Sequence, residues 1–159
     1  MNPAYIHLLT NHFPIIGAFI GLVLTFYSLL INRNTSNLKA GLVILVISCL
    51  SILPVYLSGE GAENIVEHIE GISHDKIEEH EEIAELGLVV SLFVGLLSAI
   101  TFLAVKRDSS KAKLLTYITL LSGLVLCALF AVIAHKGGEI RHPEIEQKVN
   151  VHTHDSDGD

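Results

Sequence analysis

Four long apolar runs dominate the pattern of hydrophobic and polar positions along the chain. They cover residues 13–32, 40–58, 86–105 and 114–134, and none contains Asp, Glu, Lys, Arg or His. A helix needs about 20 predominantly apolar residues to cross the hydrocarbon core of a bilayer. Each run is therefore predicted to be a membrane-spanning helix, and the fold class is predicted to be an all-α, integral membrane four-helix bundle.

The segments between the runs are short, which limits the domain organisation. Residues 1–145 are expected to form one four-transmembrane-helix domain, followed by a polar His/Asp tail at 146–159. Half of the residues are apolar and the mean hydropathy is +0.54, as expected for a chain that lies largely in lipid. No basic n-region or cleavage site precedes residue 13, so the first run is predicted to be a retained helix.

Small residues follow one face of the first and third predicted helices. The two stripes consist of Gly17, Gly21, Thr25 and Ser28, and of Ala84, Gly87, Ser91, Gly95 and Ser98. Such stripes let membrane helices approach closely. They are also interpreted as the walls of a flat slot, and one further turn outward along the second stripe reaches His80.

Basic residues set the predicted orientation. The loop after the first run holds Arg33 and Lys39 without an acid, and the loop after the third holds four Lys and Arg residues with the lone Asp108. Short loops rich in Lys and Arg stay in the cytoplasm. Both termini and residues 60–85 are then expected outside, with sixteen of the seventeen acids. The net charge of −7 therefore belongs to one face, which argues against nucleic acid or anionic lipid as the partner of that face.

The outer segment 60–85 is predicted to be an acidic helical cap. Gly59 and Gly61 are expected to break the second helix, Gly71 is expected to separate two helical pieces, and Ser73 is expected to be an N-cap. A further break is expected at residues 137–138 of the fourth helix.

Ten acids in the cap face a single Lys76, so a positive counter-charge is expected beside them. It could be an ion, a basic partner, or Lys136 and Arg141 of the fourth helix.

The histidines are the strongest functional signal. None of the nine lies in the basic loops or in an apolar run, so they are expected to gather at the outer mouth of the bundle. Imidazole binds haem iron and metal ions and transfers protons. The first hypothesis is a membrane redox module that binds b-type haem, with quinone as a small partner. Its candidate cofactor-binding residues are His7, His12, His80 and His135.

Two alternatives remain open. One is a divalent-metal binder whose mixed nitrogen and oxygen ligands suit Zn, Fe or Mn. Its candidate ligands are Glu60, Glu63, Glu67, His80, Glu139 and His142. The other is a non-catalytic structural subunit of a larger membrane complex, docked through the acidic cap. No Ser-His-Asp arrangement, phosphate loop or nucleophilic cysteine context is visible, and enzyme status stays open.

A resemblance adds to the first hypothesis. Residues 7–15 read His-Leu-Leu-Thr-Asn-His-Phe-Pro-Ile. This string resembles the N-terminal His-x4-His-Phe-Pro-Ile signature of an uncharacterised bacterial family of small four-helix membrane proteins, which also have a histidine near the start of the third helix, here His80. The resemblance implies a bacterial inner-membrane location and, since some relatives accompany cytochrome modules, a haem or electron-transfer setting. The expected partners are the lipid bilayer, a membrane or periplasmic electron-transfer protein, quinone and a second copy of the chain.

Overall fold

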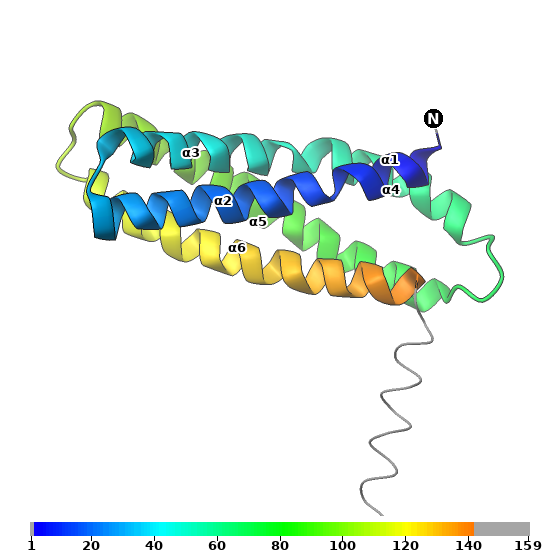
Figure 1. Cartoon of the computed structure of the whole chain (residues 1–159). Coiled ribbons are helices and arrows are strands. Elements are labelled where there is room, and N and C mark those ends of the chain that lie inside the picture. The colour runs from blue at the N-terminus through cyan, green and yellow to red at the C-terminus, as the bar shows by residue number, and fades with distance from the viewer. Residues whose placement is uncertain (1, 142–159) are drawn as a thin grey trace, which may run out of the picture.

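The computed structural model describes residues 2–141, and these form four helical rods long and apolar enough to cross a membrane (Figure 1). This confirms the predicted all-α, multi-pass membrane bundle. The helices are α1 (Pro3–Thr10), α2 (His12–Tyr27), the π-helical turn η1 (Ser28–Asn32), α3 (Thr35–Leu50), α4 (Ile52–Val66), α5 (His74–Lys106) and α6 (Ala112–Arg141). The His/Asp tail at 146–159 lies outside the described residues.

The first rod consists of α1, α2 and η1, and the second consists of α3 and α4. A proline divides each of these two rods. A helical carbonyl accepts from the N–H four residues later, and proline has no N–H. Pro14 therefore leaves Thr10, the last residue of α1, without that donor, and Pro54 does the same at Leu50, the last residue of α3. The predicted second span, 40–58, thus contains a turn at Ser51, and Thr35–Val66 as a whole remains long and apolar enough to cross a membrane.

Two glycine breaks predicted from the sequence are wrong. Gly59 and Gly61 lie inside α4, and residues 137–138 lie inside α6. At two of these positions glycine permits a close approach: an added Cβ would lie 2.8 Å from Pro3 at Gly61 and 3.1 Å from His80 at Gly137. The break at Gly71 is confirmed, because its φ of +89° is the left-handed conformation that favours glycine. Ser73 is confirmed at the N-cap position, although its side chain makes no capping hydrogen bond.

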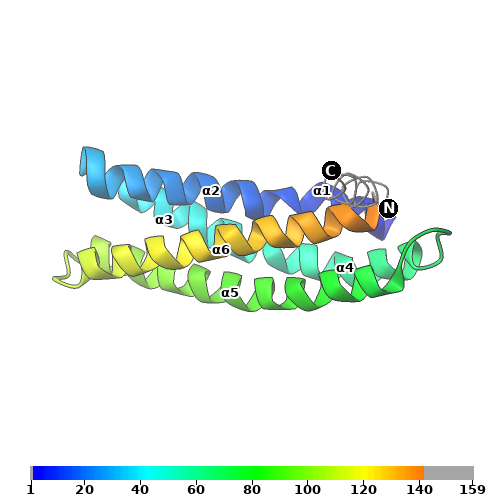
Figure 2. The ribbon, with the colours of Figure 1, turned by 90° about the horizontal axis from the view of Figure 1, so that it is seen from below.

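The rods form a four-membered ring in which α2 packs on α3, α3 on α5, α5 on α6 and α6 on α2. The start of α1, the end of α6 and the α4–α5 connection lie at one end of the bundle, and the other two connections lie at the opposite end (Figures 1 and 2). We name these the acidic end, with residues 60–85, and the basic end, with residues 33–39 and 106–113.

The small-residue stripes lie at the helix contacts. An added Cβ at Gly17 would lie 2.7 Å from Oγ of Ser48, and one at Gly21 would lie 2.9 Å from the backbone nitrogen of Leu45. On α5, Gly95 faces Cys49 at 2.9 Å, and Gly87 faces Ile133. The stripes are therefore confirmed as packing surfaces. The prediction of a flat slot between the stripes is wrong, because side chains of α3 and α6 pack against them.

Toward the acidic end the bundle divides into two helix pairs. The 33 residues of α5 span about 50 Å, whereas the hydrocarbon core is about 30 Å thick, so residues 74–85 with their six acids extend beyond it. There α1 packs on α4, and α5 packs on α6, with much less contact between α4 and α5 (Figure 1).

Candidate functional site at the acidic end

His7 projects from α1 onto α4 and is half-buried. Its Nδ1 lies 3.0 Å from the backbone oxygen of Val55, and Oγ of Ser58 lies 3.4 Å from the same nitrogen. A carbonyl oxygen can only accept, so Nδ1 of His7 donates in this contact, and Nε2 is the ring nitrogen left to face a ligand. Histidines that bind metals are usually oriented by such a hydrogen bond from the other ring nitrogen.

His80 belongs to the other helix pair and is half-buried against α6. The Cε1 atom of its ring would lie 3.1 Å from a Cβ added at Gly137, so the ring rests directly on the α6 backbone, close to Ile133 as well. Within the described residues, its buried Nδ1 has no hydrogen-bond partner of acceptable geometry. His7 is close enough for the two imidazoles to interact electrostatically.

Asn11 adds a second unpaired polar atom near this end. It lies one helical turn after His7, and its side-chain oxygen is buried without a partner among residues 2–141. A buried polar atom that lacks a hydrogen bond costs about 1 to 3 kcal/mol. Unpaired polar atoms thus occur on both helix pairs, on Asn11 and on His80.

Carboxylates surround the outer rim of the α4–α5 hairpin. Glu81 is exposed and lies in the electrostatic field of Glu60 and Glu63 from α4, and of Glu78 and Glu85 from its own helix. One predicted counter-charge is confirmed, since Nζ of Lys136 lies 3.0 Å from a carboxylate oxygen of Glu79. The side chain of Arg141 lies outside the described part of the chain.

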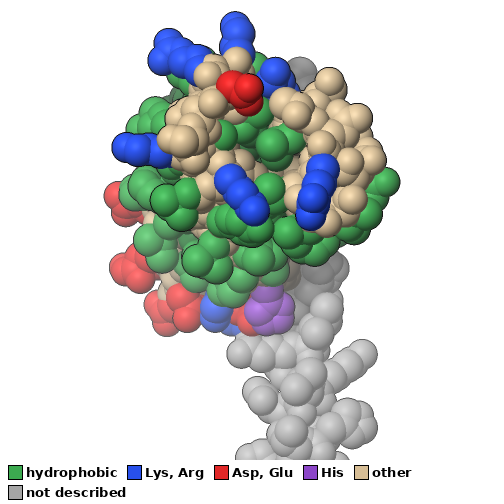
Figure 3. Space-filling view, turned by 90° about the vertical axis from the view of Figure 1, so that its left-hand side faces the viewer, with side chains coloured by type: hydrophobic (Ala, Val, Ile, Leu, Met, Phe, Trp, Pro, Cys, Tyr) green, Lys and Arg blue, Asp and Glu red, His purple; other side chains and the backbone are tan. Residues whose placement is uncertain are grey.

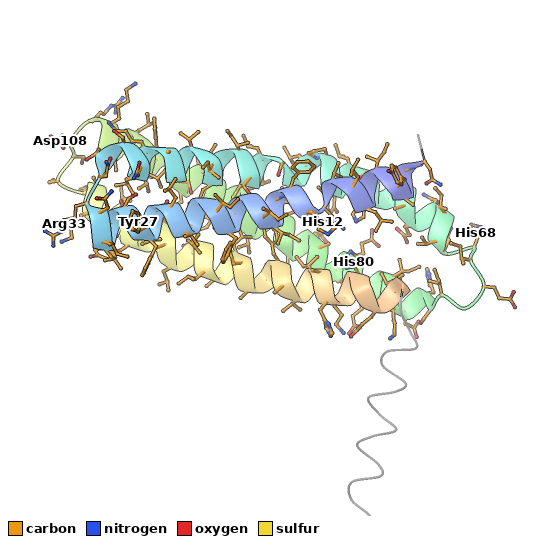
Figure 4. The ribbon with its side chains drawn as sticks, viewed as in Figure 1. His12, Tyr27, Arg33, His68, His80 and Asp108 are labelled. Carbon is orange, nitrogen blue, oxygen red and sulfur yellow. The ribbon has the colours of Figure 1, made fainter. Side chains whose placement is uncertain are left out.

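The remaining candidate ligands are dispersed. His12 is exposed at the start of α2 (Figure 4), and His135 is exposed with its Nε2 3.1 Å from Glu139. Glu67 is exposed and interacts with the adjacent His68 at 3.5 Å. Within residues 2–141, no three His, Cys, Asp or Glu side chains come together closely enough to hold a metal ion. His142 lies outside that range.

Two of the four predicted cofactor-binding histidines, His7 and His80, thus lie within electrostatic range of each other. Sequence reasoning missed Asn11, Ser58 and the Val55 carbonyl as their neighbours. The signal for Asn11 was available: positions 7, 11, 14 and 18 recur at helical spacing, and Pro14 and Ala18 are buried. The carbonyl of Val55 has no signature in the sequence.

Each of these two imidazoles can accept or donate a proton, and each can offer a nitrogen to a metal centre. No protein family, no curated protein and no solved structure matches this chain.

Proposed function

We propose that the protein is a membrane redox module in which His7 and His80 bind a b-type haem at the acidic end. One observation carries the proposal: two half-buried imidazoles on opposite helix pairs lie close enough to interact electrostatically, and the Val55 carbonyl orients the ring of His7. Quinone or a membrane or periplasmic electron-transfer protein would exchange electrons with the haem. The rim carboxylates would exchange protons with water.

The donor set fits haem better than a bare divalent ion. Haem iron takes four nitrogens from the macrocycle and needs only one or two axial ligands from the protein, whereas a structural zinc site usually needs four protein ligands. The described residues offer two neighbouring imidazoles and no group of three ligands. Gly59 and Gly137 lie beside the two rings, so no side chain at those positions blocks them.

A second candidate function is partner docking without any cofactor. It is favoured by the exposed carboxylates around Glu81, which repel one another within α5 and across the α4–α5 hairpin. A basic surface on another subunit of a membrane complex would relieve that repulsion. This candidate predicts a colourless protein, so a spectrum separates it from the first.

The decisive measurement is an absorption spectrum of the purified protein, oxidised and then reduced. The haem proposal expects a Soret band that sharpens on reduction, with separate α and β bands. His7→Ala and His80→Ala should each lose or shift these bands, while His12→Ala and His68→Ala should keep them, because both control side chains are exposed. Each variant is checked for a single gel-filtration peak. A colourless wild type that remains colourless after haem is added would overturn the proposal, as would full haem content in both ligand variants.

The proposal places the basic end in the cytoplasm and the acidic end outside, in a bacterial inner membrane. A cysteine introduced at Ser73 should then react with a membrane-impermeant thiol reagent in intact cells, and one at Ser36 should not. Both positions are exposed, and the native Cys49 and Cys127 lie within apolar spans, so the parent protein serves as the blank. Reversed labelling would invert the orientation.

A further inference from the structure

A groove at the basic end lies between the end of the first rod, the start of α3 and the start of α6. Its volume is about 360 Å³, and its lining includes Arg33, Thr35, Leu30, Leu38, Lys113 and Tyr117. The groove forms where the first rod ends: η1 is a wider π-helical turn, and Arg33 terminates it with a φ of 48°. None of the candidate residues at the acidic end belongs to it.

The groove is positively charged and open to an anion. Lys and Arg side chains are spread over this end of the molecule (Figure 3), and Asp108 is the only acid in its two loops, 33–39 and 106–113. Within residues 2–141, neither Arg33 nor Lys113 takes part in an ion pair, and both side chains are exposed. In addition, α3 and α6 both begin here, and the positive end of a helix dipole favours an anion near its N-terminus.

One side of the groove is continuous with the lipid-facing surface. Leu30 is 47% exposed and Tyr117 is 43% exposed, and Leu114 on the same helix as Tyr117 is 62% exposed. An anion at Arg33 and Lys113 would thus lie directly above an apolar helix surface. A phosphate group that carries acyl chains matches both the basic side chains and the apolar surface, whereas a free phosphate would contact only the basic side chains.

We propose that this groove binds the headgroup phosphate of an anionic phospholipid, with the acyl chains along α2 and α6. The guanidinium of Arg33 presents a planar fork that suits two phosphate oxygens, and Lys113 supplies a second charge from α6. The proposal does not depend on the haem site. It makes the basic end a lipid-binding surface as well as a topological signal.

The test is lipid binding to the detergent-purified full chain, measured by native mass spectrometry with phosphatidylglycerol or phosphatidylcholine. The double variant Arg33→Asn, Lys113→Gln is expected to weaken phosphatidylglycerol binding about thirtyfold, from about 1 kcal/mol for each basic residue near a lipid headgroup. Asn is chosen at position 33 because it tolerates the left-handed conformation.

The matched control is Lys106→Gln, Lys111→Gln, which removes the same charge from exposed positions outside the groove. It should retain affinity to within about threefold, allowing for screened long-range attraction. Equal losses in both double variants would show a diffuse charge effect and overturn the proposal. So would equal binding of the two lipids by the wild type, or displacement of phosphatidylglycerol by an equal concentration of inorganic phosphate.

Discussion

Buried polar atoms in the membrane-embedded part of the bundle and at its acidic end differ in whether they have hydrogen-bond partners. Inside the membrane the hydroxyls find partners: Oγ of Ser48 donates to the carbonyl of Pro14 at 2.7 Å, and the Thr101 and Thr119 hydroxyls are 2.9 Å apart. Thr25 is the exception, with a buried hydroxyl oxygen that lacks a partner among residues 2–141. At the acidic end both Asn11 and His80 keep an unpaired atom. The unpaired groups at the end where the helices separate support the ligand site that we propose there.

The largest expected effect is on the close packing of the membrane part. A Cβ at Gly21 would lie 2.9 Å from the Leu45 nitrogen and 3.0 Å from the Gly41 oxygen, both backbone atoms that cannot move aside cheaply. Gly21→Ala should therefore lower the free energy of unfolding in detergent by about 2 to 3 kcal/mol. Gly138→Ala is the control, since nothing lies within 4 Å of its added Cβ, and it should be neutral or stabilising. Equal losses would mean that the contact is not tight.

Replacing a hydrogen-bonded polar residue should lower the free energy of unfolding, whereas replacing an unpaired one should not. Ser48→Ala removes a hydrogen bond and should lower the free energy of unfolding by about 1 kcal/mol. Asn11→Leu removes an unpaired oxygen and should leave that free energy unchanged or raise it by up to about 1 kcal/mol in cofactor-free protein. A loss at Asn11 as large as that at Ser48 would show that Asn11 is satisfied, and the contrast between the two regions would fail.

A smaller effect is expected for the interhelical hydrogen bond between Thr101 and Thr119. A double-mutant cycle with Thr101→Val and Thr119→Val should give a coupling of about 0.6 kcal/mol, the typical value for hydrogen bonds between membrane helices. Each hydroxyl has a single proton, so one donates across the interface while the other donates to a carbonyl of its own helix. In a single variant the remaining hydroxyl can still donate to its own-helix carbonyl, which limits the loss. Strictly additive losses would mean that this bond does not stabilise the membrane part.

The smallest effect belongs to the ion pair between Lys136 and Glu79 at the acidic end. Side-chain exposures of 28% and 57% leave the pair screened by water. Lys136→Met should lower the unfolding temperature less than Gly21→Ala or Ser48→Ala does, and the difference from the wild type should disappear at about 1 M salt, where the Debye length is about 3 Å. A shift that persists at high salt would indicate a packing role for the Lys136 stem.

The four spans could be predicted from the sequence because a run of about 20 apolar residues is rarely stable outside a bilayer. The stripe on α5 could be predicted because its spacing is helical. Gly59, Gly61 and residues 137–138 were misassigned, since glycine permits either a break or a close approach and only the partner decides which. The neighbour of His7 is a backbone carbonyl, and its position depends on how α1 lies against α4. Such tertiary geometry is not encoded in local spacing.

The uninterrupted run of α5 from His74 to Lys106 has a mechanical consequence. This helix has no break between its acidic extension and its apolar span, so it moves as one rigid rod about 50 Å long. Membrane helices adapt to bilayer thickness by tilting. A tilt of about 10° would move one end of α5 sideways by about 9 Å relative to the other. The distance between His80 and His7 would then respond to the thickness of the surrounding membrane, unless α1 tilts with α5.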